Sequence, residues 1–201
     1  MLIRQKLADG TEYVMFGRYH QDEDGNPDST TPISWLVLEQ DPKSRLSLLL
    51  SRFALDHKPM TKHLKPVFWE NSYLRKWLNH DFMEAAFTPE ERNLIITTDL
   101  ENQGNGQNTQ DQIFILSRDE LCRRLRTPES RSCPPSQYVM AEVADTGTYI
   151  LNGGCCYWLR TPGNYGSESA CLITGDGSLD FDFGYDDNYA VRPALRVRLP
   201  S

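Results

Sequence analysis

Oxygen-bearing side chains stand at every second position in one short stretch near the C-terminal end of the sequence: Asp176, Ser178, Asp180 and Asp182. Alternating oxygen ligands are typical of the first half of a calcium-binding loop. An EF-hand loop beginning at Asp176 would need Gly at its sixth position and Glu at its twelfth, where this chain has Phe181 and Asp187. The EF-hand motif therefore fails, and a looser calcium site stays open as an alternative.

The same stretch also fits a half-buried strand. Leu179, Phe181 and Phe183 alternate with Asp180 and Asp182, so apolar and acidic side chains would point to opposite faces. In that interpretation the apolar side chains pack inward and the carboxylates face water. Both interpretations place the aspartates on an exposed surface.

Thiols are the second candidate for chemistry. The chain has five cysteines, an odd number without CxxC spacing: Cys122, Cys133, Cys155, Cys156 and Cys171. This pattern suits reduced, mostly buried thiols better than a disulfide framework or a zinc site. We therefore expect the cysteines to pack as small apolar side chains.

Other catalytic and nucleotide-binding motifs are missing from the sequence. Residues 163–166 lack the Lys and the spacing of a phosphate-binding loop, and residues 175–177 lack the remainder of a dinucleotide fingerprint. The four histidines show no metal-binding spacing, and no GxSxG nucleophile elbow is present. We expect neither enzymatic activity nor a cofactor.

A longer segment, residues 158–195, gives the acidic stretch its context. It opens with the run Trp-Leu-Arg-Thr-Pro-Gly and closes with Val-Arg-Pro-Ala-Leu, two frames that each combine apolar residues with an arginine. Between the frames the residues are small, aromatic or acidic, and Glu168 is the only long charged side chain. Binding surfaces built from Tyr, Ser, Gly and Asn use this mixture. The pattern predicts a display segment at 158–195 carried by a scaffold at 1–157.

Within this segment we expect ten residues to be displayed to a ligand: Asn164, Tyr165, Ser167, Ser178, Asp180, Asp182, Tyr185, Asp187, Asn188 and Tyr189. Phe181 or Phe183 is a further candidate. Six apolar residues should pack beneath them: Trp158, Leu159, Leu172, Ile173, Val191 and Leu195. Arg160 and Arg192 have two interpretations, as residues that hold the segment through carboxylates or as ordinary surface charges.

Composition limits the class of protein. With 201 residues and 39% hydrophobic residues, the chain is long enough to bury a core as one domain, residues 1–201. No run approaches the ~20 apolar residues of a membrane span, and a net charge of -7 argues against nucleic acid as a partner. The start of the chain has no secretory pattern, which favours the cytoplasm or a phage particle assembled there.

The elements that must position the display segment are short and mixed. Residues 33–38 and 46–50 should form two antiparallel strands, and a helix should begin after Asn71 or Ser72. Thr88 and Ser117 should cap two further helices, whereas residues 138–144 fit strand or helix equally. Further strands are expected at residues 94–98, 113–116, 149–151, 156–159 and 190–197. This order predicts an α+β fold of mixed short antiparallel strands with two or three helices.

Six ordered motifs carry a family resemblance: residues 16–19, 32–38, 50–55, 69–79, 158–163 and 191–195. Together they resemble the bacterial and phage family DUF6273, across nearly the whole chain. The family's usual aromatic pair before Trp158 is here Cys156-Tyr157, a departure from the pattern. Members of this family occur as variable proteins of diversity-generating retroelements. The resemblance therefore implies a C-terminal segment rewritten by error-prone reverse transcription, held on a C-type-lectin-like fold.

The genetic code offers a check on that implication. Template codons of the form AAY mutate to NNY, which cannot encode Lys, Glu, Gln, Met or Trp. Residues 164–189 obey this limit except at Glu168, which should then belong to the framework.

The expected function is that of a non-enzymatic, ligand-binding variable protein. Its ligand would be an unknown protein or other surface ligand, recognised by the displayed residues. One alternative is an oxidoreductase like the formylglycine-generating enzymes, which use a cysteine pair and copper; Cys155, Cys156 and Cys171 invite that interpretation. Another is a calcium-dependent sugar-binding module, although the EPN, QPD and WND signatures of those lectins are missing.

Overall fold

The computed structural model describes residues 3–6, 10–20, 30–104, 106–146, 149–164 and 166–199. Six strands form its larger sheet: β1 (Ile3–Lys6), β2 (Glu12–Tyr19), β3 (Thr31–Gln40), β4 (Leu46–Ser51), β8 (Ile113–Phe114) and β15 (Ala194–Arg198). Their order is β1-β2-β3-β4-β15-β8, and every neighbouring pair is antiparallel. The predicted strand pair at residues 33–38 and 46–50 is confirmed.

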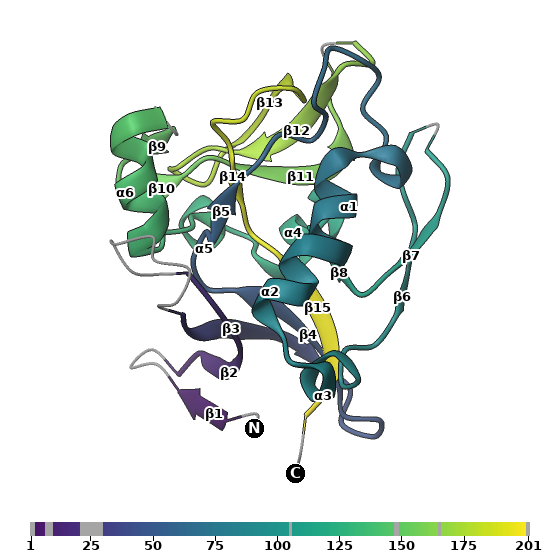
Figure 1. Cartoon of the computed structure of the whole chain (residues 1–201), viewed down its shortest axis with the longest axis vertical. Helices are drawn as coiled ribbons and strands as arrows, with labels where there is room; N and C mark the ends of the chain where they lie inside the picture. The colour runs from purple at the N-terminus through teal and green to yellow at the C-terminus, as the bar shows by residue number, and fades with distance from the viewer. Residues whose placement is uncertain are drawn as a thin grey trace.

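A second sheet carries most of the display segment. Its five strands are β5 (Asp56–His57), β11 (Tyr157–Pro162), β12 (Ser169–Ile173), β13 (Leu179–Phe183) and β14 (Ala190–Val191). They lie in the order β13-β12-β11-β14-β5, so β13 is an edge strand, and only the β11–β14 pair is parallel. Figure 1 shows this sheet in the upper half of the molecule and the six-stranded sheet below it.

Two short ribbons complete the strands. They are the pair β6 (Thr98–Leu100) and β7 (Thr109–Asp111), and the pair β9 (Ile150–Leu151) and β10 (Gly154–Cys155). The strand predicted at residues 94–98 is wrong, because Leu94 is exposed and Ile95 makes only an isolated bridge to Val197. The strand predicted at residues 113–116 is limited to β8.

Local capping signals place the helices. Ser72 caps α1 (Tyr73–Trp77), which continues through the π-helical η2 (Leu78–Phe82) into α2 (Met83–Ala86). Capping boxes at Thr88 and Ser117 start α3 (Pro89–Arg92) and α4 (Arg118–Arg124), as the sequence predicted. The remaining helical segments are η1 (Trp69–Asn71), α5 (Pro128–Arg131) and α6 (Gln137–Thr146).

These helices exceed the two or three that were expected. Residues 138–144 are helical rather than extended, and α5 is a single turn that begins at a proline. Thr127 accepts the N–H of Ser130 and so starts α5 despite its short length. The fold is α+β, with several antiparallel sheets and about five helices counted over the described residues.

One strand prediction fails at an informative position. Residues 190–197 were expected to form a single strand, but they divide into β14 in the upper sheet and β15 in the lower sheet. Pro193 stands at the division, where it has no N–H to donate to a ladder, and its carbonyl accepts the N–H of Ser51 at 2.9 Å. The chain therefore crosses from the upper sheet to the lower sheet near the C-terminal end of the display segment.

A continuous apolar cluster joins the two sheets and the helices. Trp35, Trp69 and Trp158 lie in it with relative exposures of 0–2%. All six residues predicted to pack beneath the display segment belong to this cluster. Within the described residues, no helix is long and apolar enough to span a membrane.

Candidate ligand-binding surface

The connections of the upper sheet leave from two opposite ends. Ser169 at the start of β12 pairs with Phe183 at the end of β13, and Gly184 donates its N–H to Glu168 at 2.9 Å. The β11–β12 connection (residues 163–168) and the start of the β13–β14 connection (residues 184–189) therefore meet at one end. The β12–β13 turn (residues 174–178) lies at the other end, because Ile173 pairs with Leu179.

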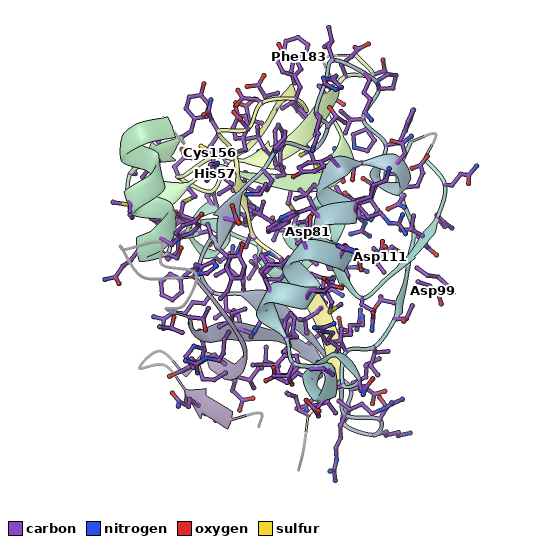
Figure 2. All side chains as sticks on the ribbon, viewed as in Figure 1. His57, Asp81, Asp99, Asp111, Cys156 and Phe183 are labelled. Carbon is purple, nitrogen blue, oxygen red and sulfur yellow. The ribbon has the colours of Figure 1, made fainter. Side chains whose placement is uncertain are left out.

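The first end gathers three of the predicted display residues, and we call it the display end, consisting of Asn164, Ser167, Phe183 and Tyr185. All four are exposed, and the rings of Phe183 and Tyr185 stack with centroids 5.7 Å apart. Phe183 projects from the upper extremity of the molecule (Figure 2). Tyr165, also predicted here, lies outside the described residues.

Asp187 and Asn188 lie on the return path of the β13–β14 connection. That connection starts at the display end and returns along the sheet to β14, where Ala190 pairs with Tyr157 at the beginning of β11. Asp187 is exposed and Asn188 is half-buried. The Asn188 carbonyl accepts the N–H of Tyr149 at 3.3 Å, so this path is fixed to the scaffold by its backbone.

Ser178 lies apart from the other predicted residues. It is exposed in the β12–β13 turn, where the Asp176 carboxylate accepts the Thr174 hydroxyl at 2.6 Å and the Ser178 N–H at 3.0 Å. These hydrogen bonds lower the pKa of Asp176. The carboxylate that would open a calcium loop thus stabilises a turn instead.

Asp180 and Asp182 have a structural role at the edge of the sheet. Asp180 accepts the N–H of Phe181 at 2.9 Å, and Asp182 accepts the N–H of Phe183 at 2.7 Å. Acidic side chains that occupy backbone donors of an edge strand discourage pairing with another chain. The expected alternation is only partly right, because Leu179 and Phe183 are 40% and 44% exposed while Phe181 packs against the core.

The prediction that Tyr189 is displayed to a ligand is wrong, because its side chain is only 7% exposed. Its ring lies 4.4 Å from that of Trp158 and 5.2 Å from that of Tyr149, and its hydroxyl donates to Asp182 at 2.5 Å. Burial, with the neighbouring Asp182 carboxylate, raises the pKa of this phenol. Tyr189 therefore belongs to the framework, and Asp182, which accepts its hydroxyl, is half-buried.

The frame arginines are both buried, so neither is an ordinary surface charge. Arg160 is 3% exposed and makes a two-pronged ion pair with Glu120, with one N–O distance of 2.9 Å. Its remaining donors bond Asn102 and the carbonyls of Glu101 and Ile115. The prediction that a carboxylate holds Arg160 is confirmed.

Arg192 is held differently. Its guanidinium donates to the carbonyls of Ser51 and Arg131, each at 3.0 Å, and to the Tyr157 hydroxyl at 3.1 Å. It also lies 5.3 Å from the centre of the Tyr157 ring. Carbonyl dipoles and an aromatic face thus stabilise this charge, so neither interpretation of Arg192, a carboxylate partner or an ordinary surface charge, is right.

An open polar hollow of about 540 Å³ adjoins Arg160, and it lies outside the predicted site. It is lined by the 101–103 segment and the first turns of α4, including Glu120 and Arg123. All five N–H groups of Arg160 are already used by the protein, so Arg160 itself offers a ligand in the hollow no free donor. We therefore interpret the hollow as part of the packing between β11 and α4.

A scaffold segment that the sequence did not single out reaches the display end. Thr61 donates its N–H to the Gly184 carbonyl at 2.8 Å, and Val67 donates to the Ser167 carbonyl at 2.7 Å. Figure 1 shows this segment at the upper end of the molecule, beside the β11–β12 connection. Both contacts join backbone groups a hundred or more residues apart in sequence, which no local pattern signals.

The thiols show little of the character that catalysis requires. All five cysteines are unpaired, and Cys133, Cys155, Cys156 and Cys171 are buried. Burial raises the pKa of all four, that of Cys171 to about 12, whereas a reactive cysteine needs a low pKa. Among the described residues, no group of three or more His, Cys, Asp or Glu side chains is placed to hold a metal ion.

Comparison with known protein families adds one match. Residues 44–199 match the model of a family described as a domain of unknown function, DUF6273. The chain belongs to the DUF6273 family. The match runs from the turn before β4 through β15, so the DUF6273 region includes both the display segment and the scaffold segment that contacts it. Searches among curated proteins and among solved structures gave no match.

Proposed function

We propose that this DUF6273 protein is a non-enzymatic binding protein that recognises a protein or other surface ligand through its 158–195 segment. One observation carries the proposal: exposed Asn164, Ser167 and Tyr185 stand at one end of a sheet whose supporting residues are buried. A rigid support lowers the entropy cost of binding, and small polar residues beside Tyr adapt to many ligands.

The origin of the segment is part of the same proposal. We propose that a diversity-generating retroelement diversifies the exposed positions and that the fold is C-type-lectin-like. The absence of Lys, Gln, Met and Trp between residues 164 and 189 supports adenine-directed mutation of AAY codons. The half-buried position of Glu168, the one residue that breaks the codon limit, supports its assignment to the framework.

Binding can be tested with a random-peptide library displayed on phage and selected against the purified chain. The test variant carries Asn164→Ala, Ser167→Ala and Tyr185→Ala, and the control carries three alanines at exposed positions elsewhere, Gln110, Arg126 and Asn93. We expect the selected peptides to lose at least about tenfold in affinity for the test variant and to keep their affinity for the control. Equal affinity for both variants would contradict the proposal.

Metal analysis separates the two alternatives from the proposal. A copper oxidase or a calcium-dependent lectin should bind its metal at one equivalent per chain when the purified protein is equilibrated with that ion. The raised thiol pKa values weigh against the oxidase, and the use of Asp176 as a turn cap weighs against the calcium loop. Stoichiometric copper or calcium would favour the corresponding alternative.

A further inference from the structure

The display end has a basic neighbour in the scaffold, residues 62–66, which we call the basic loop. Its sequence is Lys-His-Leu-Lys-Pro, and all five residues are exposed. Leu64 is 66% exposed, more than any other large apolar residue in the described part of the chain. A single exposed leucine is common on a protein surface, and Leu64 is informative because Phe183 and Tyr185 are also exposed at the end of the sheet that this loop contacts.

Both ends of the basic loop are fixed. Met60, Thr61 and Val67 are buried, and the backbone bonds from Thr61 to Gly184 and from Val67 to Ser167 hold the loop against the display end. The geometry around Gly184 is tight, because a Cβ added there would collide with the Val67 side chain. The basic loop and the aromatic pair of Phe183 and Tyr185, which flanks Gly184, therefore form a single surface with little freedom to separate.

The charge of the basic loop opposes that of the chain. The net charge is -7, yet within the described residues neither Lys62 nor Lys65 forms an ion pair. The Lys62 ammonium instead lies 4.3 Å from the centre of the Tyr73 ring. The lysines are thus positioned to meet an external anion.

We propose that the basic loop is a constant half of the recognition surface and that the partner is a protein with an acidic patch around an apolar centre. An apolar centre of leucine and stacked aromatic rings with a charged rim is the usual anatomy of a protein interface. Flanking lysines give it electrostatic complementarity to carboxylates. This inference rests on the proposed function, because it assigns the chemistry of the partner bound at the same end.

The peptides selected on the wild-type chain test the partner's chemistry. We expect them to be rich in Asp and Glu with at least one large apolar residue, and their affinity should fall as salt is added. A basic or uncharged set of peptides would overturn the proposal. So would tight binding of phosphatidylserine vesicles or of sialylated glycans that depends on the basic loop while the peptides do not, since the anion would then be a lipid or a sugar.

Substitutions locate the binding. A loop variant carries Lys62→Ser, Leu64→Ser and Lys65→Ser, and a matched control carries Lys43→Ser, Leu94→Ser and Arg126→Ser at exposed sites elsewhere. We expect the loop variant to bind the peptides about thirtyfold more weakly or worse, and the control to bind within about twofold of wild type. Both variants should keep the wild-type unfolding midpoint, because every substituted side chain is exposed.

The two proposals fail in different ways. Loss of binding in the display-end variant with full binding in the loop variant would leave the proposed function standing and overturn the role of the basic loop. Loss only in the loop variant would contradict recognition by the display segment, and the basic loop would then bind alone and not as half of a shared surface. Full binding in both variants would contradict both proposals.

Discussion

A buried arginine costs free energy unless its donors and its charge are compensated, and the two frame arginines meet this requirement in different ways. Arg160 has a carboxylate partner in Glu120, whereas Arg192 relies on carbonyls and on the Tyr157 ring. The partner of Arg160 lies forty residues away in sequence. The capping-box position of Glu120 was readable from the sequence, but its second role at Arg160 was not, because that depends on how α4 packs on β11.

Glu120→Gln should destabilise the chain by about 3–5 kcal/mol at neutral pH, since it leaves the Arg160 charge buried without a counter-ion. Glutamine can still accept the Ser117 N–H, so the helix cap is kept. Urea unfolding at neutral pH measures the loss. Replacing both Glu120 and Arg160 by Met should recover much of it.

The pH dependence of the same pair follows from the pKa of Glu120. Burial raises this pKa, but the hydrogen bond and charge of Arg160 outweigh burial and leave it below the usual value of 4.5. A lowered folded pKa means that the stabilisation is complete above the unfolded pKa and is lost as pH falls through the folded pKa. The difference in the free energy of unfolding between wild type and Glu120→Gln should therefore disappear at acidic pH. If this difference is unchanged at the lowest pH at which the chain still folds, the stabilisation does not come from the charged Glu120 carboxylate.

Truncation of two tyrosines in the display segment should change the free energy of unfolding by very different amounts. Tyr189→Ala should cost about 3 kcal/mol, because it removes a buried ring that contacts Trp158. Tyr189→Phe should cost about 1 kcal/mol, for the lost hydrogen bond to Asp182. Tyr185→Ala, at a side chain 46% exposed, should change stability by no more than about 0.5 kcal/mol. Similar losses at the two positions would contradict the division into framework and display residues.

At the scale of elements, three helix starts were predicted correctly because they depend only on neighbouring residues. Ser72, Thr88 and Ser117 start helices because a cap needs only the next three residues. The limits of β14 and β15 could not be predicted in the same way, since an apolar run gives no sign of which sheet each part joins. Tyr189 was misassigned for a related reason, because composition does not reveal that the return path presses one tyrosine against Trp158.

The β12–β13 turn gives a prediction at this scale. Gly177 has φ +87°, and a Cβ there would collide with the backbone carbonyl of Pro128 on α5. Gly177→Ala should therefore cost more than about 2 kcal/mol, the sum of a left-handed backbone and the displacement of α5. Gly153, with φ +81° and no atom within 4 Å of an added Cβ, is the matched control.

Thermal or urea unfolding distinguishes the two glycines. Gly153→Ala should lose only the backbone contribution, about 1 kcal/mol. An equal loss at Gly177 would mean that α5 does not pack against the turn at this position.

At the scale of the whole molecule, the six-stranded sheet lies below the upper sheet, and α6 and α1 lie to its left and right in the view of Figure 1. Phe183 of the display end lies at the top of the same view (Figure 2). The division into a scaffold and a C-terminal display segment stays a prediction from composition. The position of residues 62–66 beside the display end was not predicted, because the run Lys-His-Leu-Lys-Pro has no periodicity or motif that indicates where the loop lies. Only the backbone bonds to Ser167 and Gly184 bring them to the site.

We propose that exposed positions of the 158–195 segment vary to bind ligands while the buried frame stays constant. The most direct measurement is to sequence this locus across many copies in a natural population, together with its flanking DNA. We expect substitutions at adenine-derived positions of codons 164–189, concentrated at exposed residues such as Asn164, Ser167 and Tyr185, with a reverse transcriptase and a near-identical template repeat nearby. A uniform locus without either, or substitutions spread evenly over Trp158, Arg160 and Arg192, would contradict the account.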